Sequence, residues 1–238
     1  IVAAGRQVDE ALGTKFTGQL ESRVGISFPA IDTSAYTSLD MRRDEVDAIL
    51  AKRGLERDGY GMFLSRIAPA KGVDDLLEAW TTSELYGKKK LIICGNGPAK
   101  EEMRERAKTL EGIEVLDDVS DEEKGALMNG CYTWCLPSKP RPEFIETFGI
   151  AVAEKMLAGG LGPVITTRTG GIPEASGGNC LEHEAGNVDE LRDCLNRVAA
   201  MTDEEREQLA TSARQFAMQF DRQEILARLV ARASNGVQ

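Results

Sequence analysis

The feature that most constrains the fold is a regular alternation of short apolar runs with amphipathic helical stretches, which starts near Asp58. Each apolar run is too short for a helix and is followed by turn residues, so it predicts a β-strand. Strand, turn and helix at this cadence predict an α/β fold with a Rossmann-like parallel sheet and helices on both faces. Such sheets bind ligands beyond the carboxyl ends of their strands. The predicted strands are residues 61–65, 91–94, 113–116, 133–136 and 163–167, with a short one around Leu181.

Helices are predicted where apolar residues recur at helical spacing between capping and terminating residues. For one of them, Thr147 is a suitable N-cap, apolar residues continue through Leu157, and Gly159 and Gly160 suit the left-handed turn that ends a helix. The other predicted helices are residues 40–54, 72–80, a charged helix ending at 110, 121–129 with Ser120 or Asp121 as its cap, and three stretches that begin near 188, 203 and 222.

The first residues differ in pattern from the rest of the chain. Residues 1–20 form a short apolar run and an amphipathic stretch, residues 24–28 predict a strand, and a Pro-containing segment follows. The chain also starts at Ile1 and not at Met, so we expect a processed N-terminus or a missing upstream part. We therefore interpret residues 1–33 as the end of a preceding domain with its linker, and residues 34–238 as the main domain.

Composition excludes several classes of function. A net charge of -10 argues against a nucleic-acid partner, for which a basic stripe is expected. No apolar run approaches the roughly 18 residues that a membrane helix needs, and no signal peptide is visible. The five cysteines are odd in number and lie mostly in apolar contexts, which favours reduced thiols in a cytoplasmic protein. Because His183 is the only histidine, we expect neither a zinc site at Cys131 and Cys135 nor a catalytic triad.

Two carboxylates flank the start of the predicted helix at Thr147. Glu146 and Glu154 would line one side of that helix if it begins near Thr147. The free N–H groups of Phe148, Gly149 and Ile150 would favour a phosphate. Carboxylates accept hydrogen bonds from vicinal hydroxyls, so the pair suits a nucleotide-sugar. The alternative is a surface helix with solvated glutamates.

Three further features follow predicted strands. Arg66 and Lys71 could clamp a diphosphate, or form a plain basic turn. Gly95 and Gly97 form a turn that permits backbone approach to a ligand, although no third glycine completes a dinucleotide fingerprint. The turn from 170 to 174 could bring Glu174 or backbone N–H groups to the same cleft, or be an ordinary loop.

Together these residues resemble the C-terminal, donor-binding domain of GT-B glycosyltransferases, most closely the retaining enzymes of family 4. The resemblance extends from about residue 24 to 220, and a weaker one points to glycosyltransferases of aminoglycoside pathways. Its specificity lies in the order of several motifs and not in any single one. These motifs are SRIAPAKG, LIICGNGP, VSDEEKGALMNG, the Glu, seven residues, Glu pattern in ETFGIAVAE, EKMLAGG and GGIPE.

The resemblance implies a role for each residue. Arg66 and Lys71 would contact the diphosphate, Glu154 the ribose and Glu146 the transferred sugar, with Glu146, Arg66 and Lys71 taking part in catalysis. The other implied donor-binding residues are Gly95, Gly97, Leu116, Val119, Phe148, Gly149 and Ile150. The strand end at 115–117 reads Val-Leu-Asp where the family usually has Phe-Leu-Gly, which puts the base contact in doubt. Residues 138–143 lengthen the loop before Glu146.

The function implied is transfer of a hexose or N-acetylhexosamine from a nucleotide-sugar, with a UDP-sugar favoured, to an acceptor with retention of configuration. The acceptor would be a saccharide, an aminocyclitol or a lipid, and neither cofactor nor metal is expected. A full GT-B enzyme also has an N-terminal acceptor domain, of which only the end would lie in residues 1–33. The alternatives are a non-catalytic nucleotide-sugar-binding subunit that acts with a companion chain, and a Rossmann-type dehydrogenase, against which the incomplete dinucleotide fingerprint argues.

Overall fold

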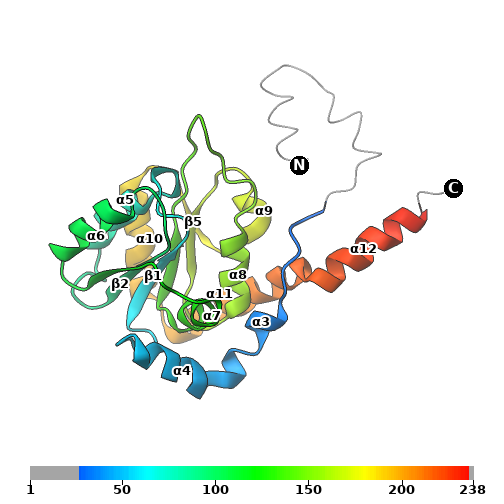
Figure 1. Cartoon of the computed structure of the whole chain (residues 1–238), viewed down its shortest axis with the longest axis horizontal. Coiled ribbons are helices and arrows are strands. Elements are labelled where there is room, and N and C mark those ends of the chain that lie inside the picture. The colour runs from blue at the N-terminus through cyan, green and yellow to red at the C-terminus, as the bar shows by residue number, and fades with distance from the viewer. Residues whose placement is uncertain (1–26, 236–238) are drawn as a thin grey trace.

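The computed structural model describes residues 27–235, which contain a parallel sheet of six strands in the order β3-β2-β1-β4-β5-β6. The predicted α/β, Rossmann-like fold is confirmed (Figure 1). Side chains of the central strands are buried on both faces of the sheet, which is why these strands were visible as continuous apolar runs. The strands are β1 (Tyr60–Leu64), β2 (Lys90–Cys94), β3 (Ile113–Leu116), β4 (Thr133–Leu136), β5 (Val164–Thr167) and β6 (Leu181–His183).

The strand order reverses between β1 and β4. From β1 the chain moves outward through β2 to β3, then returns to place β4 on the other side of β1 and continues to β5 and β6. At such a switch point the loops that follow the two central strands diverge and leave a crevice at the carboxyl edge of the sheet. The loops after β1 and β4 carry Arg66, Lys71 and Glu146.

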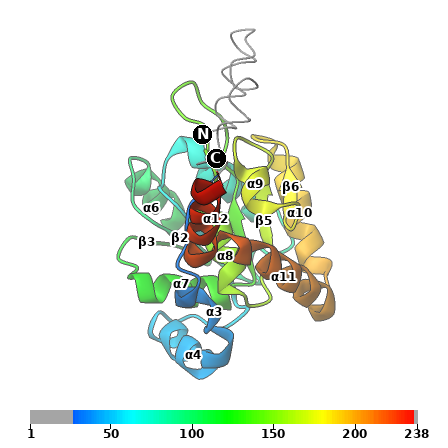
Figure 2. The ribbon, with the colours of Figure 1, turned by 90° about the vertical axis from the view of Figure 1, so that its right-hand side faces the viewer.

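Helices cover both faces of the sheet (Figures 1 and 2). On one face α10 packs on α5, and on the other α8 packs between α7 and α11, with α4 against α7. The helices are α3 (Ser34–Thr37), α4 (Arg43–Lys52), α5 (Val73–Thr81), α6 (Lys100–Lys108), α7 (Asp121–Gly130), α8 (Ile150–Ala158), α9 (Ile172–Ser176), α10 (Val188–Ala200), α11 (Asp203–Ala217) and α12 (Arg222–Asn235), with 3-10 turns at Asp40–Arg42, Pro69–Lys71 and Met218–Phe220.

The core lies between the sheet and its helices. Trp80 of α5 is fully buried and packs against β1 at Gly61, where a Cβ atom would lie 2.4 Å from the indole ring. A glycine in this central strand therefore makes room for the tryptophan. Trp134 of β4 is also fully buried, so one tryptophan packs on β1 and the other belongs to β4.

The segment before β1 belongs to the same core. Val46 and Leu50 of α4 are buried, so packing extends upstream of Asp58, where the strand and helix alternation starts. Ile31 bridges Asp221, and the Thr33 hydroxyl donates to the Asp221 carboxylate at 2.6 Å. The first described residues are thus tied to the start of α12, which projects away from the sheet in Figure 1. The division at residues 33 and 34 stays a prediction.

Most predicted elements are confirmed to within two residues, and Ser120 caps α7 through a capping box with Glu123. The predicted stretch 1–20 and the start of the predicted strand 24–28 lie outside the described residues, and residues 27 and 28 form no strand. Within the described part of the chain, no helix is long and apolar enough to cross a bilayer.

The predicted start of the helix that carries Glu154 is wrong. Helix α8 begins at Ile150 with Gly149, and not Thr147, as its N-cap, and Gly149 lies in the left-handed region (φ 86°). Glycine adopts this left-handed conformation at low cost because it has no Cβ atom. Glu146 consequently lies in the preceding loop, and the two glutamates do not share one helix.

Candidate functional site

The centre of the candidate site is an ion pair between the loops that follow β1 and β4. Lys71 Nζ donates to the carboxylate of Glu146, and the same ammonium lies 4.6 Å from the centroid of the Phe144 ring. The Lys71 and Glu146 side chains are only 14% and 13% exposed. The pair thus bridges the two sides of the switch point.

Backbone packing holds Lys71 in place. It ends the Pro69–Lys71 turn, and Gly72 follows in the left-handed conformation with φ 68°. A Cβ atom on Gly72 would lie 1.9 Å from the carbonyl oxygen of Pro137. The loops that follow β1 and β4 therefore approach each other as closely as two backbones can. The Lys139 N–H donates to the Ala70 carbonyl at 2.9 Å and joins them again.

Glu146 is held by its main chain. The Gly171 N–H donates to the Glu146 carbonyl at 2.8 Å, and a Cβ on Gly170 would lie 1.9 Å from the same oxygen. Gly170 and Gly171 therefore position Glu146, whereas residues 172–174 of the predicted turn belong to helix α9, where Glu174 is exposed. The long loop after β4, which rises above the sheet in Figures 1 and 2, is closed at its tip by a bridge between Arg141 and Phe144.

Arg66 precedes Lys71 by five residues in the loop after β1. Its side chain is exposed, with no hydrogen bond or ion pair to any residue between 27 and 235. The residues on either side of Arg66, Ser65 and Ile67, are held by backbone packing. A Cβ atom on Gly95 would lie 1.9 Å from the Ser65 carbonyl oxygen, and one on Gly97 would lie 2.3 Å from the Ile67 carbonyl oxygen. Packing between two loops thus explains both glycines, and their predicted contact with a ligand stays a prediction.

Glu154 has two partners. The Tyr36 hydroxyl donates to one carboxylate oxygen at 2.9 Å, and Lys124 Nζ of α7 lies 2.7 Å from the other. Burial and the neighbouring Glu154 charge raise the pKa of Tyr36 above its usual range. Glu154 and Ile150 both line a pocket of about 510 Å³ between α8, α7 and the segment of α3 and α4.

The remaining predicted residues border the edge of the sheet. Phe148 is buried in an aromatic cluster, with its ring 5.1 Å from that of Phe220, so its side chain does not point into a cleft. Leu116 pairs with Cys94 at the end of β3, and Val119 packs against the core. Asp117, in the loop between them, binds Lys100 at 2.9 Å, and hydrogen bonds from Lys100 and Arg104 hold the pKa of Asp117 below its usual range.

A family comparison decides what kind of protein carries this site. Residues 46–216 match the family of glycosyl transferases group 1. The chain belongs to this family. The glycosyltransferase domain is 30% identical over 163 residues to the uncharacterized glycosyltransferase MJ1178 of Methanocaldococcus jannaschii, a match that covers 68% of this chain and 44% of that protein.

Solved structures share the fold of this domain. Crystal structures of Anabaena Alr3699/HepE, in complex with UDP and glucose and with UDP-glucose, superpose with TM-scores of 0.72 and 0.70 at 21% and 22% identity. They cover 89% and 87% of this chain, and the chain covers 57% of each. The glycosyltransferase domain therefore spans about half the length of these relatives.

Sequence reasoning missed the partners of the predicted residues. Phe144 beside Lys71, and Tyr36 and Lys124 beside Glu154, come from segments whose proximity depends on the fold. Within residues 27–235, no group of three His, Cys, Asp or Glu side chains could hold a metal ion. All five cysteines are free, and His183 is buried with Nδ1 2.9 Å from the Glu184 carbonyl oxygen, in agreement with a structural role.

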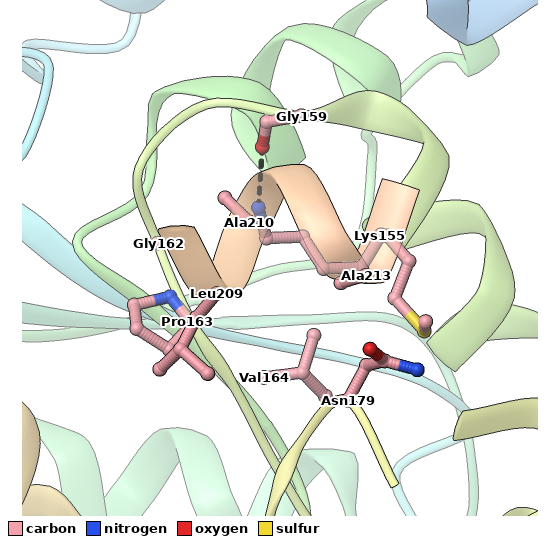
Figure 3. Close-up of a pocket in the computed structure, with 10 residues that line it drawn as sticks. Lys155, Gly159, Gly162, Pro163, Val164, Asn179, Leu209, Ala210 and Ala213 are labelled. Carbon is pink, nitrogen blue, oxygen red and sulfur yellow. Dashed lines mark hydrogen bonds between the residues drawn. The ribbon is translucent and has the colours of Figure 1, made fainter. Parts of the chain in front are cut away.

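Two other cavities lie away from the carboxyl edge. One of about 380 Å³ is lined by several charged side chains, of which Asp40 and Arg214 form an ion pair. The other, between α8, β5 and α11, measures only about 10 Å³, enough for one water. Figure 3 shows Lys155 beside this small cavity, donating to the Gly159 carbonyl at 2.7 Å. Burial lowers the pKa of Lys155.

Proposed function

We propose that this chain is the donor-binding part of a retaining, family 4-like glycosyltransferase that transfers a hexose or N-acetylhexosamine from a UDP-sugar to an acceptor. The observation that carries the proposal is the ion pair of Lys71 with Glu146, with the exposed Arg66 in the same loop as Lys71, at the switch point of a group 1 glycosyltransferase domain. The presence of UDP and UDP-glucose in the crystals of Alr3699/HepE supports a uridine donor.

The two cations suit the leaving group of such a reaction. Transfer of the sugar leaves a nucleoside diphosphate with additional negative charge on its terminal phosphate. Arg66 and Lys71 would stabilise that charge as it develops, because fixed cations act most strongly where water is excluded. We therefore expect neither a metal nor a cofactor, so chelation of divalent ions should leave donor binding unchanged.

The carboxylates would orient the donor. Glu146 would accept hydrogen bonds from hydroxyl groups of the transferred sugar. Glu154 would accept from the ribose, since a carboxylate offers about four acceptor positions and Tyr36 and Lys124 occupy two. Backbone N–H groups of Phe148, Gly149 and Ile150 would contact sugar or phosphate, and the stretch from Leu116 to Val119 would border the base.

Catalysis also requires an acceptor site, and this requirement gives a second candidate function. The chain covers 44% of one relative and 57% of the solved structures, so further parts of those proteins have no counterpart in it. If the acceptor site is in a separate chain, this chain is a nucleotide-sugar-binding subunit. Hydrolysis and transfer assays with a UDP-sugar, on the chain alone and with candidate companions, distinguish the two functions.

Calorimetry tests the donor site directly. The chain is titrated with UDP, GDP, ADP, NAD and uridine, and we expect UDP to bind most tightly and NAD not to bind. Arg66→Ala should weaken UDP binding about 10- to 100-fold, the usual contribution of a hydrogen bond to a charged group, and leave uridine binding unchanged. Arg192→Ala on the remote helix α10 is the matched control. Equal losses of affinity for UDP and uridine in Arg66→Ala would contradict the proposal. Binding of NAD alone by the wild type would contradict it as well.

A further inference from the structure

In the ligand-free site, the charge of Lys71 is paired with a carboxylate of the chain itself. Its ammonium is paired with Glu146 and covered by the Phe144 ring, and both charged side chains are largely buried. Arg66, by contrast, is exposed and has no partner among residues 27–235. Of the two cations proposed to bind the diphosphate, one is therefore neutralised by a neighbouring carboxylate before any ligand arrives.

The main chain of Glu146 is held in place. Its carbonyl accepts from the Gly171 N–H, and Gly170 packs against the same oxygen. The loop that carries it is fastened at its base by an ion pair between Lys139 and Asp75 at 2.6 Å, with both side chains mostly buried. Any ligand that enters the site thus meets a carboxylate paired with the proposed phosphate-binding cation.

A donor and the product left after transfer differ at this point. The donor carries sugar hydroxyls, which can donate to Glu146 while Lys71 turns to the diphosphate. The nucleoside diphosphate has no such hydroxyls, and its terminal phosphate carries up to one more negative charge at neutral pH. That charge would lie where the sugar was attached, and a like charge nearby disfavours binding.

From this difference, and resting on the proposed function, we propose that Glu146 shifts the preference of the site from the free nucleoside diphosphate toward the sugar-loaded donor. Its carboxylate neutralises Lys71 until sugar hydroxyls replace the ammonium as its hydrogen-bond partner. Glu146 is thus a specificity-determining residue that promotes release of the spent donor, in addition to orienting the sugar.

The test measures the dissociation constants of UDP and UDP-glucose by calorimetry for the wild type, Glu146→Gln and Glu143→Gln. The exposed Glu143 lies in the same loop, so Glu143→Gln removes an equal charge without touching Lys71. Glu146→Gln should bind UDP about ten-fold more tightly and UDP-glucose no more tightly, since the amide keeps the shape but not the charge. Glu143→Gln should leave both constants within two-fold of the wild type.

Each outcome discriminates. A Glu146→Gln chain that binds UDP more weakly, or within two-fold of the wild type, overturns the inference but leaves the donor site standing. A loss of packing alone would weaken both ligands and lower the unfolding temperature, and it would not tighten UDP selectively. If neither ligand binds the wild type or the variant at millimolar concentration, the proposed function itself is wrong, and the inference fails with it.

Discussion

At the scale of single residues, three glycines determine how close the loops at the carboxyl edge of the sheet can lie. Cβ atoms on Gly72, Gly95 and Gly170 would each lie 1.9 Å from a carbonyl oxygen of another loop. No side chain fits at that distance, so the loops meet backbone to backbone. The result is a rigid frame, which is what a site needs to hold two charges together without external support.

Gly72→Ala should damage both stability and donor binding. It is compared with Gly87→Ala, because both glycines are left-handed, at φ 68° and 74°, but nothing lies within 4 Å of a Cβ on Gly87. The control should lose about 1 kcal/mol of unfolding free energy from backbone strain alone. Gly72→Ala should lose at least about 2 kcal/mol more, because the loops must separate. Urea denaturation measures the unfolding free energies of the two variants. Equal losses of unfolding free energy would show that the contact of Gly72 with Pro137 is unimportant.

What the sequence could predict about the site depends on the kind of contact. Lys71 and Glu146 were predicted in one cleft because parallel strands place their following loops at one edge. Their direct pairing, and the pairing of Glu154 with Tyr36 and Lys124, were not predicted, because those partners are far apart in the chain. Such contacts depend on helix positions that local patterns do not encode.

At the scale of elements, helix α7 is tied to α4 by charge. Arg53, which follows α4, donates to Glu123 at 2.7 Å and lies 3.0 Å from Asp118 in the loop before α7. Glu123 also closes the capping box with Ser120. The Arg53 hydrogen bond, assisted by the Ser120 N–H, lowers the pKa of Glu123 to about 2 from its usual 4.5. One carboxylate thus holds the start of α7 and its attachment to α4.

The lowered pKa predicts how acid affects this attachment. Because the folded state binds the proton less readily than the unfolded state, the stabilisation is fully present above pH 4.5 and is lost as the pH falls toward 2. Glu123→Gln, which keeps a cap acceptor, should cost about 1 kcal/mol at pH 7, and the difference from wild type should shrink between pH 4.5 and 2. Urea midpoints at several pH values measure it, with the exposed Glu122→Gln as the control. A pH-independent difference would contradict the linkage.

Element boundaries show where sequence patterns succeed and fail. The strands 113–116 and 133–136 were predicted with their observed bounds, because short apolar runs in parallel sheets are flanked by turns. The start of α8 was misplaced, because threonine is a common cap, whereas a left-handed glycine directly before a helix has no distinctive pattern. The error placed Glu146 directly before the helix, whereas it lies in the loop four residues before Ile150.

At the scale of the whole molecule, the candidate site joins the two halves of the sheet. Arg66 and Lys71 follow β1, on the side of β2 and β3, while Glu146 follows β4, on the side of β5 and β6. The halves also share a core, because β1 pairs with β4 and the start of the described chain is bonded to Asp221. We therefore expect the described domain to unfold in a single step, and a ligand at the site to stabilise both halves equally.

Two tryptophans report on the two halves separately. Trp80 packs on β1 and Trp134 belongs to β4. Both indole N–H groups are buried without a hydrogen-bond partner among residues 27–235. Replacing either tryptophan by phenylalanine therefore removes no hydrogen bond within this part of the chain. In Trp80→Phe and Trp134→Phe, the fluorescence of the remaining indole should give a melting transition that coincides with the one seen by circular dichroism.

Saturation with UDP at 100 times its dissociation constant adds about 2.7 kcal/mol to the unfolding free energy, which should raise both melting temperatures by about 5 to 10 °C. Arg66→Ala at the same UDP concentration should show a much smaller shift. If only one tryptophan responds to UDP, the ligand does not bridge β1 and β4, and the site lies in one half of the sheet alone.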